Sequence, residues 1–175
     1  MKTDPTNERS PTLRRATAAD VVPIRDLVAA AYGKYVALIG RTPIPMLTDY
    51  AAAVRDHDVW VLDSEGTVVG VIELAGRDNH LWLDNVAIAP EWQGRGLGRW
   101  LLGHAEAEAQ RLRLPEIRLL TNERYVENIA IYTRYGYRET HREPHLGTDL
   151  VYFAKRLDRA EIGQANRELR PVDER

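Results

Sequence analysis

The 175-residue chain contains no cysteine, which excludes disulfide frameworks, thiolate metal sites and cysteine nucleophiles. Serine is almost as rare. Of its two serines, Ser10 lies in a polar N-terminal segment and Ser64 in a predicted hairpin turn, and neither position suits a strand-to-helix nucleophile elbow. No apolar run approaches the ~20 residues that cross a bilayer, and the first 12 residues lack the apolar core of a signal peptide. We therefore expect a cytoplasmic protein without a membrane partner.

An excess of positive charge is also missing. The sequence has 24 basic and 26 acidic residues, a formal net charge of −2, which argues against nucleic acid as a partner. The length suits one domain. We expect a flexible tail over residues 1–12, a single domain over 13–157 and a charged tail over 158–175.

The first half of the sequence predicts two helices followed by three strands. Apolar residues recur every three or four positions from Ala18 to Leu38, which predicts a helix that Asp20 or Thr17 can cap. After a break rich in proline and glycine, residues 46–55 predict a short second helix. The apolar and β-branched runs 59–62, 68–74 and 81–88 predict an antiparallel meander.

The second half changes to a strand–loop–helix–strand order. A glycine-rich loop follows the strand 81–88 directly, and apolar spacing then predicts a helix from Leu97 to a stop near Pro115. A strand over 117–120, a helix over 128–135 ended by Gly136, and strands over 137–141 and 150–153 complete the order. From Lys155 onward the charged residues predict frayed helix or coil. The fold class is α/β: one domain with an N-terminal helical pair, an antiparallel meander and a mixed sheet.

The glycine-rich loop predicts a site for an anion such as phosphate. Glycines between a strand and a helix N-terminus present free backbone N–H groups at the positive end of the helix dipole. Two nucleotide motifs fail on spacing. Counting from Gly94, the third glycine of a dinucleotide fingerprint falls on Arg99, and the pair Gly98 and Gly103 is followed by His104-Ala105 where a P-loop needs Lys and Ser or Thr.

Two segments resemble the GCN5-related N-acetyltransferase (GNAT) family. Residues 93–98, Gln-Gly-Arg-Gly-Leu-Gly, resemble its Q/R-x-x-G-x-G/A signature and follow Val86-Ala87-Ile88-Ala89-Pro90. Residues 128–137, from Asn128 through Tyr132 to Gly136-Tyr137, resemble a second family block downstream. The order of predicted elements also fits the family fold, so the resemblance covers roughly residues 13–157.

The resemblance implies acetyl-CoA as the donor. In the family, the pantetheine arm pairs with the strand before the loop, here Val86, Ala87 and Ile88, and the diphosphate lies on the loop amides. Arg95 and Arg99 either add charge near the phosphates or are solvated surface residues. The implied loop contacts are Gln93, Gly94, Arg95, Gly96, Leu97, Gly98 and Arg99.

The resemblance also suggests residues for the chemistry. Tyr132 matches the family tyrosine that protonates the leaving coenzyme A thiolate, although an amphipathic helix also places aromatic residues in a core. Asn128 precedes it by one turn, on the same helical face, and is a candidate pantetheine contact. The family asparagine stands seven residues before the tyrosine, and Tyr125 occupies that position here. We expect Tyr135 and Tyr137 to be packing residues.

The general base is less well specified. The family glutamate on the strand before the loop falls on Trp82. Asp84 is the nearest acid on the same face of that strand by period-two alternation, and Glu73 on the preceding strand is the second candidate. A chain of water molecules is the third.

The acceptor site is expected on the N-terminal helices and the segment between them. Tyr32, Tyr35 and Arg41 supply aromatic and cationic groups there, but these residue types do not identify a substrate. His141 and His145 have the spacing of a helical zinc site, yet Pro144 argues against a helix and we expect no metal. The remaining histidines, His57, His80 and His104, are isolated in the sequence.

These observations predict an N-acetyltransferase. Without a cysteine, transfer proceeds by direct attack of a primary amine, on a small molecule or peptide, upon the bound thioester. The alternative is a catalytically silent acyl-CoA-binding regulatory module on the same fold. The sequence also allows a homodimer.

Overall fold

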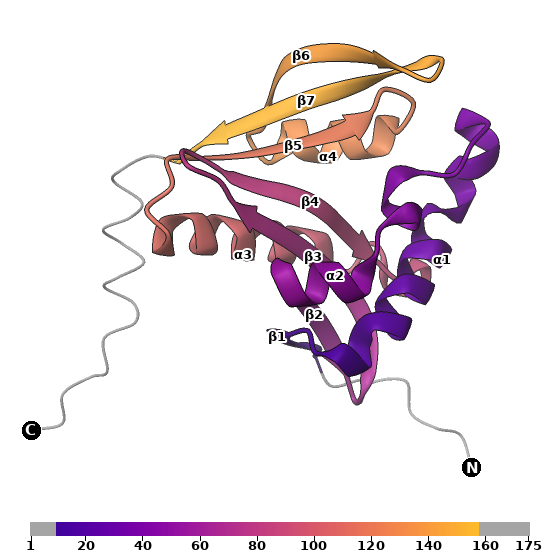
Figure 1. The fold of residues 1–175 in the computed structure, drawn as a ribbon, viewed down its shortest axis with the longest axis vertical. Coiled ribbons are helices and arrows are strands. Elements are labelled where there is room, and N and C mark those ends of the chain that lie inside the picture. The colour runs from indigo at the N-terminus through magenta and orange to yellow at the C-terminus, as the bar shows by residue number, and fades with distance from the viewer. Residues whose placement is uncertain (1–9, 158–175) are drawn as a thin grey trace, which may run out of the picture. The chain divides into compact units, whose positions relative to one another are not determined.

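The computed structural model describes residues 10–157, which form two compact units (Figure 1). The described part of the first unit comprises residues 10–75 and 83–103, and that of the second comprises residues 76–82 and 104–157. The chain passes between the units at the end of strand β3 (Thr67–Gly76), within strand β4 (Leu81–Ile88) and within helix α3 (Leu97–Arg111). The predicted order of helices, meander, glycine loop, helix and strand is confirmed.

The first unit is built on a meander. Its strands β1 (Thr12–Arg15), β2 (Asp58–Ser64), β3 (Thr67–Gly76) and β4 lie side by side in chain order. The pairs β1–β2 and β2–β3 are antiparallel. β3 is buried from Val69 to Ala75, as expected for a central strand with both faces covered.

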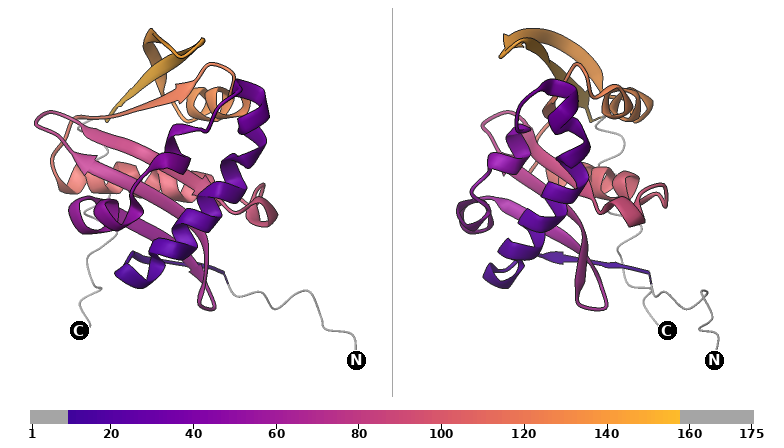
Figure 2. Two further views of the ribbon diagram at one scale, coloured as in Figure 1. Left: turned by 45° about the vertical axis from the view of Figure 1, so that its right-hand side comes forward. Right: turned by 90° about the vertical axis from the view of Figure 1, so that its right-hand side faces the viewer.

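Two helices of the first unit lie on one face of the meander (Figure 2). A 3₁₀ turn, Ala18–Asp20, leads into α1 (Val21–Ile39), which ends at Gly40 with a φ of 70°. The predicted second helix divides into a 3₁₀ turn, Ile44–Leu47, and α2 (Tyr50–Asp56). The division arises because the Asp49 side chain caps α2, accepting bonds from the N–H groups of Ala51 and Ala52.

The second unit has strands β5 (Glu116–Asn122), β6 (Arg138–His145) and β7 (Thr148–Arg156), in the order β5-β7-β6 and antiparallel. Helix α4 (Val126–Arg134) ends as predicted at Gly136, whose φ is 85°. The N–H groups of Gly136 and Tyr137 bond to the carbonyls of Thr133 and Tyr132, the two bonds of a Schellman motif.

Some elements differ from the sequence-based expectations. The short strand β1 was not predicted, and β6 and β7 extend beyond 137–141 and 150–153 to a turn at Leu146-Gly147. The expectation of coil or frayed helix from Lys155 is wrong for Lys155 and Arg156, which continue β7. β6 is an edge strand, exposed except at its last residue, so no apolar alternation marks it. The C-terminal tail lies outside the described residues.

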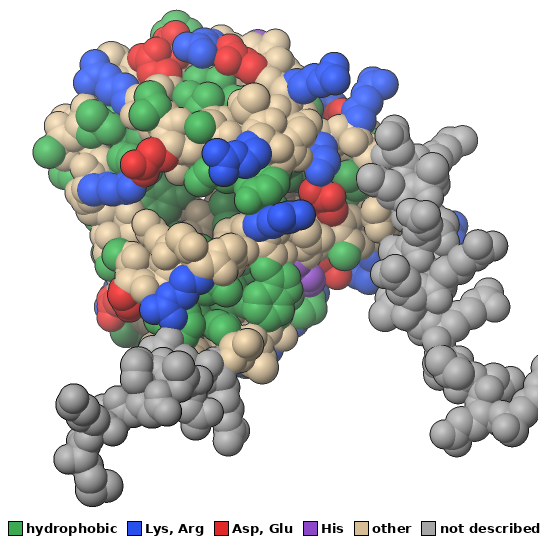
Figure 3. Space-filling model, turned by 180° about the vertical axis from the view of Figure 1, so that it is seen from behind, with side chains coloured by type: hydrophobic (Ala, Val, Ile, Leu, Met, Phe, Trp, Pro, Cys, Tyr) green, Lys and Arg blue, Asp and Glu red, His purple; other side chains and the backbone are tan. Residues whose placement is uncertain are grey.

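Charge is mixed over the surface. On the face drawn in Figure 3, Lys and Arg side chains are interspersed with Asp and Glu side chains. Among residues 10–157, no helix is long and apolar enough to span a membrane.

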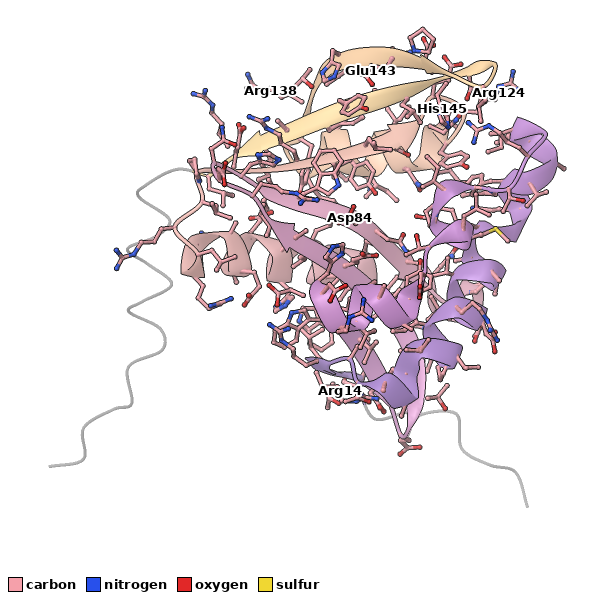
Figure 4. All side chains as sticks on the ribbon, viewed as in Figure 1. Arg14, Asp84, Arg124, Arg138, Glu143 and His145 are labelled. Carbon is pink, nitrogen blue, oxygen red and sulfur yellow. The ribbon has the colours of Figure 1, made fainter. Side chains whose placement is uncertain are left out.

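An arginine network fixes the start of the first unit. The Arg14 guanidinium, on β1 (Figure 4), donates two bonds to the Asp20 carboxylate, at 2.8 and 2.9 Å, and two to Asp63, at 2.7 and 3.0 Å. Asp20 also accepts the Thr17 N–H at 2.7 Å. These bonds join β1, β2 and the start of α1, and the bond to Arg14 is the main cause that lowers the pKa of the Asp20 carboxyl to about 2.

We predict that Asp20→Asn lowers the free energy of unfolding by about 2 kcal/mol at pH 7. Since the folded-state pKa of Asp20 is depressed, its stabilisation is present above pH 4 and is lost as the pH falls toward 2. The stability difference between wild type and variant should therefore shrink on acidification. Urea unfolding between pH 7 and pH 3 measures it, and a difference independent of pH would contradict the assignment.

Candidate functional site

The loop between β4 and α3 has the geometry of an anion site. A 3₁₀ turn, Pro90–Trp92, leads into Gly94 and Gly96, whose φ values of 76° and 80° lie in the left-handed region that favours glycine. α3 begins at Leu97, so the N–H groups of its first turn have no partner within the helix. A Cβ atom at Gly94, Gly96 or Gly98 would meet no heavy atom within 4 Å. The loop therefore presents its backbone openly at the N-terminus of a 15-residue helix.

Hydrogen bonds from side chains and backbone fix this loop at the end of β4. The Gln93 side-chain amide donates to the carbonyl of Ile88 at 3.0 Å, and the Ala89 N–H bonds to Val69 on β3 at 3.0 Å. The Arg95 guanidinium lies 4.5 Å from the Trp92 ring centroid and donates to the Glu91 carbonyl at 3.2 Å. Arg95 thus folds back onto its own loop, whereas Arg99 is exposed on the first turn of α3.

A buried amide joins β4 to both N-terminal helices. Asn85 is 4% exposed; its Oδ1 accepts the Tyr32 hydroxyl at 2.9 Å and its Nδ2 donates to the Tyr50 oxygen at 3.0 Å. The Tyr50 hydroxyl in turn donates to the carbonyl of Pro45 at 2.8 Å. Burial raises the pKa of Tyr50 to about 12, so this phenol stays protonated and keeps its donor at neutral pH.

Three ionisable side chains converge beside this amide. His57, which follows α2, places its Nδ1 2.7 Å from Oε1 of Glu73 on β3 and 3.9 Å from Oδ2 of Asp84 on β4. Figure 4 labels Asp84 on β4. Glu73 is only 3% exposed, and burial raises the pKa of its carboxyl, opposed by the hydrogen bond from His57. The structure thus brings together both acids considered as the base, with a histidine that the sequence left isolated.

The expected acceptor residues lie on α1 and directly after it. Tyr32 and Tyr35 are buried with ring centroids 5.9 Å apart, and Arg41 is half-buried. The Tyr32 hydroxyl also lies 3.4 Å from the carbonyl oxygen of Val86. Tyr32 therefore touches the strand expected to bind the donor.

The residues of the second motif lie in the second unit. Tyr132 is buried on α4, with ring centroids 5.8 Å from Tyr137 and 6.0 Å from Phe153. Asn128 is half-buried one turn before it, and Tyr125, also buried, precedes the helix. Tyr137 is buried and Tyr135 half-buried, which agrees with packing roles.

His141 and His145, for which we expect no metal, both lie on β6. His141 stacks on Tyr152 at 4.2 Å between ring centroids, and His145 ends the strand. Within residues 10–157, a metal ion could be held by one group of side chains, His57, Glu73 and Asp84. Their possible ligand atoms all lie within 4.8 Å of one another.

Comparison with known proteins identifies the fold. Residues 55–139 match the family model of the acetyltransferase (GNAT) domain. This chain has the fold of the GNAT acetyltransferases. The resemblance seen in residues 93–98 and 128–137 is thereby confirmed, and the matched region begins within α2 and reaches the start of β6.

Several solved structures share this fold over most of the chain. The PaiA N-acetyltransferase of Thermoplasma acidophilum, in complex with coenzyme A, has 18% identity and a TM-score of 0.72 over 85% of this chain and 100% of its own. The ribosomal-protein-S18-alanine N-acetyltransferase of Escherichia coli has 19% identity and a TM-score of 0.69, over 83% and 93%. YncA of Salmonella typhimurium, a putative acetyltransferase with acetyl-CoA, has 22% identity and 0.67, over 86% and 96%. No curated protein sequence matched the chain.

We predict that Asn85→Ala lowers the free energy of unfolding by about 2–3 kcal/mol, because it removes two buried hydrogen bonds and the packed amide that makes them. Asn79→Ala is the matched control, since Asn79 lies in the exposed turn between β3 and β4 and should change stability by under about 0.5 kcal/mol. Urea unfolding of both variants measures this. Equal effects would show that the Asn85 bridge contributes nothing specific.

Proposed function

We propose that this protein is an N-acetyltransferase that moves the acetyl group of acetyl-CoA to a primary amine by direct attack. The observation that carries the proposal is the open glycine loop at the N-terminus of α3, within a domain that matches the GNAT family. Four of the similar structures were solved with coenzyme A or acetyl-CoA bound. We assign the catalytic domain to residues 13–157.

The donor site combines two backbone segments of the first unit. Val86, Ala87 and Ile88 are the proposed partners of the pantetheine arm. The diphosphate lies against residues 93–99, where glycine permits close approach and the helix dipole favours negative charge. Exposed Arg99 is better disposed than Arg95 to add charge there, since Arg95 is held on Trp92.

The chemistry needs a neutral amine, a stabilised oxyanion and a protonated leaving thiolate. We assign the last task to Tyr132 and a pantetheine contact to Asn128, on the family register of α4. We assign Tyr32, Tyr35 and Arg41 to the acceptor site. We assign Asp84 as the base that takes up a proton from the acceptor. A silent acyl-CoA-binding module would bind the donor but release no free coenzyme A when amines are added.

The loop assignment predicts that Gly98→Ala weakens acetyl-CoA binding by at least about tenfold, or 1.4 kcal/mol, because a Cβ in the first turn of α3 blocks approach to the backbone. Alanine should leave the free energy of unfolding unchanged or raise it by up to about 1 kcal/mol. Calorimetric titration with acetyl-CoA measures the affinity.

Gly103→Ala is the matched control, because Gly103 is exposed on the same helix and a Cβ there also meets no atom within 4 Å. It should bind acetyl-CoA like the wild type. Equal affinity of the two variants would refute a diphosphate site at the loop.

The acid assignment predicts that Tyr132→Phe lowers turnover by about 10²-fold, the low end for a positioned general acid, since a thiolate leaves readily. The ring remains, so fold and donor affinity should survive. Tyr135→Phe, three residues along α4, is the control and should retain turnover. Coenzyme A release at saturating acetyl-CoA measures both. Loss of turnover in the control alone would mean that the register of this motif is wrong.

A further inference from the structure

We infer that His57 is the proton acceptor for the amine substrate, with Glu73 as its positioning residue and Asp84 as the carboxylate that attracts the ammonium group. This inference rests on the proposed function and replaces the simpler assignment of Asp84 alone as the base. It comes from the convergence of α2, β3 and β4 in the first unit.

The hydrogen bond to Glu73 determines which nitrogen can act. With Nδ1 2.7 Å from the Glu73 carboxylate, the neutral imidazole that donates from Nδ1 keeps its lone pair on Nε2. The His57 side chain is 35% exposed, whereas that of Glu73 is 4% exposed. A buried carboxylate thus orients an accessible imidazole, and the carboxylate itself is too enclosed to meet a substrate.

The charges around His57 favour a cationic acceptor. Glu73 faces it from β3, Asp84 from β4, and Asp56 precedes it at the end of α2. Tyr50 lies near Glu73 but stays protonated at neutral pH. These carboxylates attract a cation, so an ammonium group is held where the imidazole can take its proton. The substrate class that fits is a protonated primary amine.

The cluster also lies beside the proposed donor strand. Asp84 precedes Val86 by two residues on β4, a separation of about 7 Å at the rise of an extended strand. Asn85, between them, bonds to Tyr50 at the start of the same helix that His57 follows. The base and the strand proposed for the pantetheine arm are therefore linked through α2 and Asn85.

The proposed acetyl transfer begins at the ammonium group of the acceptor. His57 Nε2 takes one proton from the ammonium group, and the neutral amine attacks the thioester carbonyl. The nitrogen–carbon bond forms, the carbon–sulfur bond breaks, and the thiolate takes up the second proton, which the attacking nitrogen releases. The products are the acetamide, free coenzyme A and one proton, which leaves through His57 to solvent.

The first test is the pH profile of kcat/KM for a primary alkylamine. Wild-type kcat/KM should rise with pH, because a base accepts a proton only in its unprotonated form. His57→Gln keeps a donor for Glu73 but cannot take up a proton, so it should lower kcat/KM by about 10²- to 10⁴-fold and abolish that rise. Added imidazole should restore part of the activity. His141→Gln, at an exposed histidine of β6, is the control and should leave the profile unchanged.

The second test concerns Glu73. Glu73→Gln removes the negative charge beside Nδ1, so kcat should fall while the KM for the amine, which Asp84 attracts, is unchanged, a split that a merely structural role would not produce. Acetyl-CoA affinity, measured by calorimetry, should be unchanged in His57→Gln. If the wild type does not bind acetyl-CoA, the proposed function fails. If it binds and acetylates but His57→Gln retains both rate and profile, the inference on His57 fails alone.

A metal-bound cluster is the remaining outcome to exclude. Calorimetric titration with Zn²⁺ alone should show no stoichiometric site that disappears in His57→Gln. Stoichiometric binding lost in that variant, with activity removed by a chelator and restored by Zn²⁺, would overturn the proton-acceptor assignment in favour of a metal site.

Discussion

The buried amide of Asn85 is the constraint on which the arrangement of the first unit depends. A buried amide must find partners, and Asn85 finds them on α1 and α2 through Tyr32 and Tyr50. Tyr50 begins α2 and His57 follows this helix. The position of His57 against Glu73 therefore depends on the hydrogen bond by which Asn85 of β4 fixes α2. One strand thus positions the proposed base and contains, from Val86 onward, the residues that we propose for the donor.

The glycine loop imposes a second constraint of a different kind. It acts through backbone conformation, since Gly94 and Gly96 adopt left-handed φ values and leave their surroundings open. Side chains of neighbouring residues stabilise the loop without covering it, as the Gln93 bond to Ile88 and the Arg95 contact with Trp92 illustrate. A preformed backbone site of this type suits the diphosphate of the proposed donor, while we assign acceptor recognition to the helices.

The sequence predicted what local patterns determine. The 3.6-residue spacing of α1, the β-branched runs of the meander, the loop glycines and the Gly136 stop all specify structure within a few neighbouring residues. The edge strand β6 was underestimated because it has no buried face along most of its length. His57 was missed because its role depends on three segments meeting, and residues 57, 73 and 84 have no spacing in the sequence that signals contact. The Arg14 network shows the same dependence on distant residues.

The central claim is that the protein transfers acetyl groups to amines rather than only binding their donor. Mass spectrometry of a panel of primary amines, incubated with the protein and acetyl-CoA carrying a deuterated acetyl group, tests this most directly. The account predicts a product with the labelled acetyl group on nitrogen and one equivalent of free coenzyme A for each product formed. Donor binding without a labelled product from any amine, protein N-terminus or lysine peptide in the panel would contradict it and favour the silent binding module.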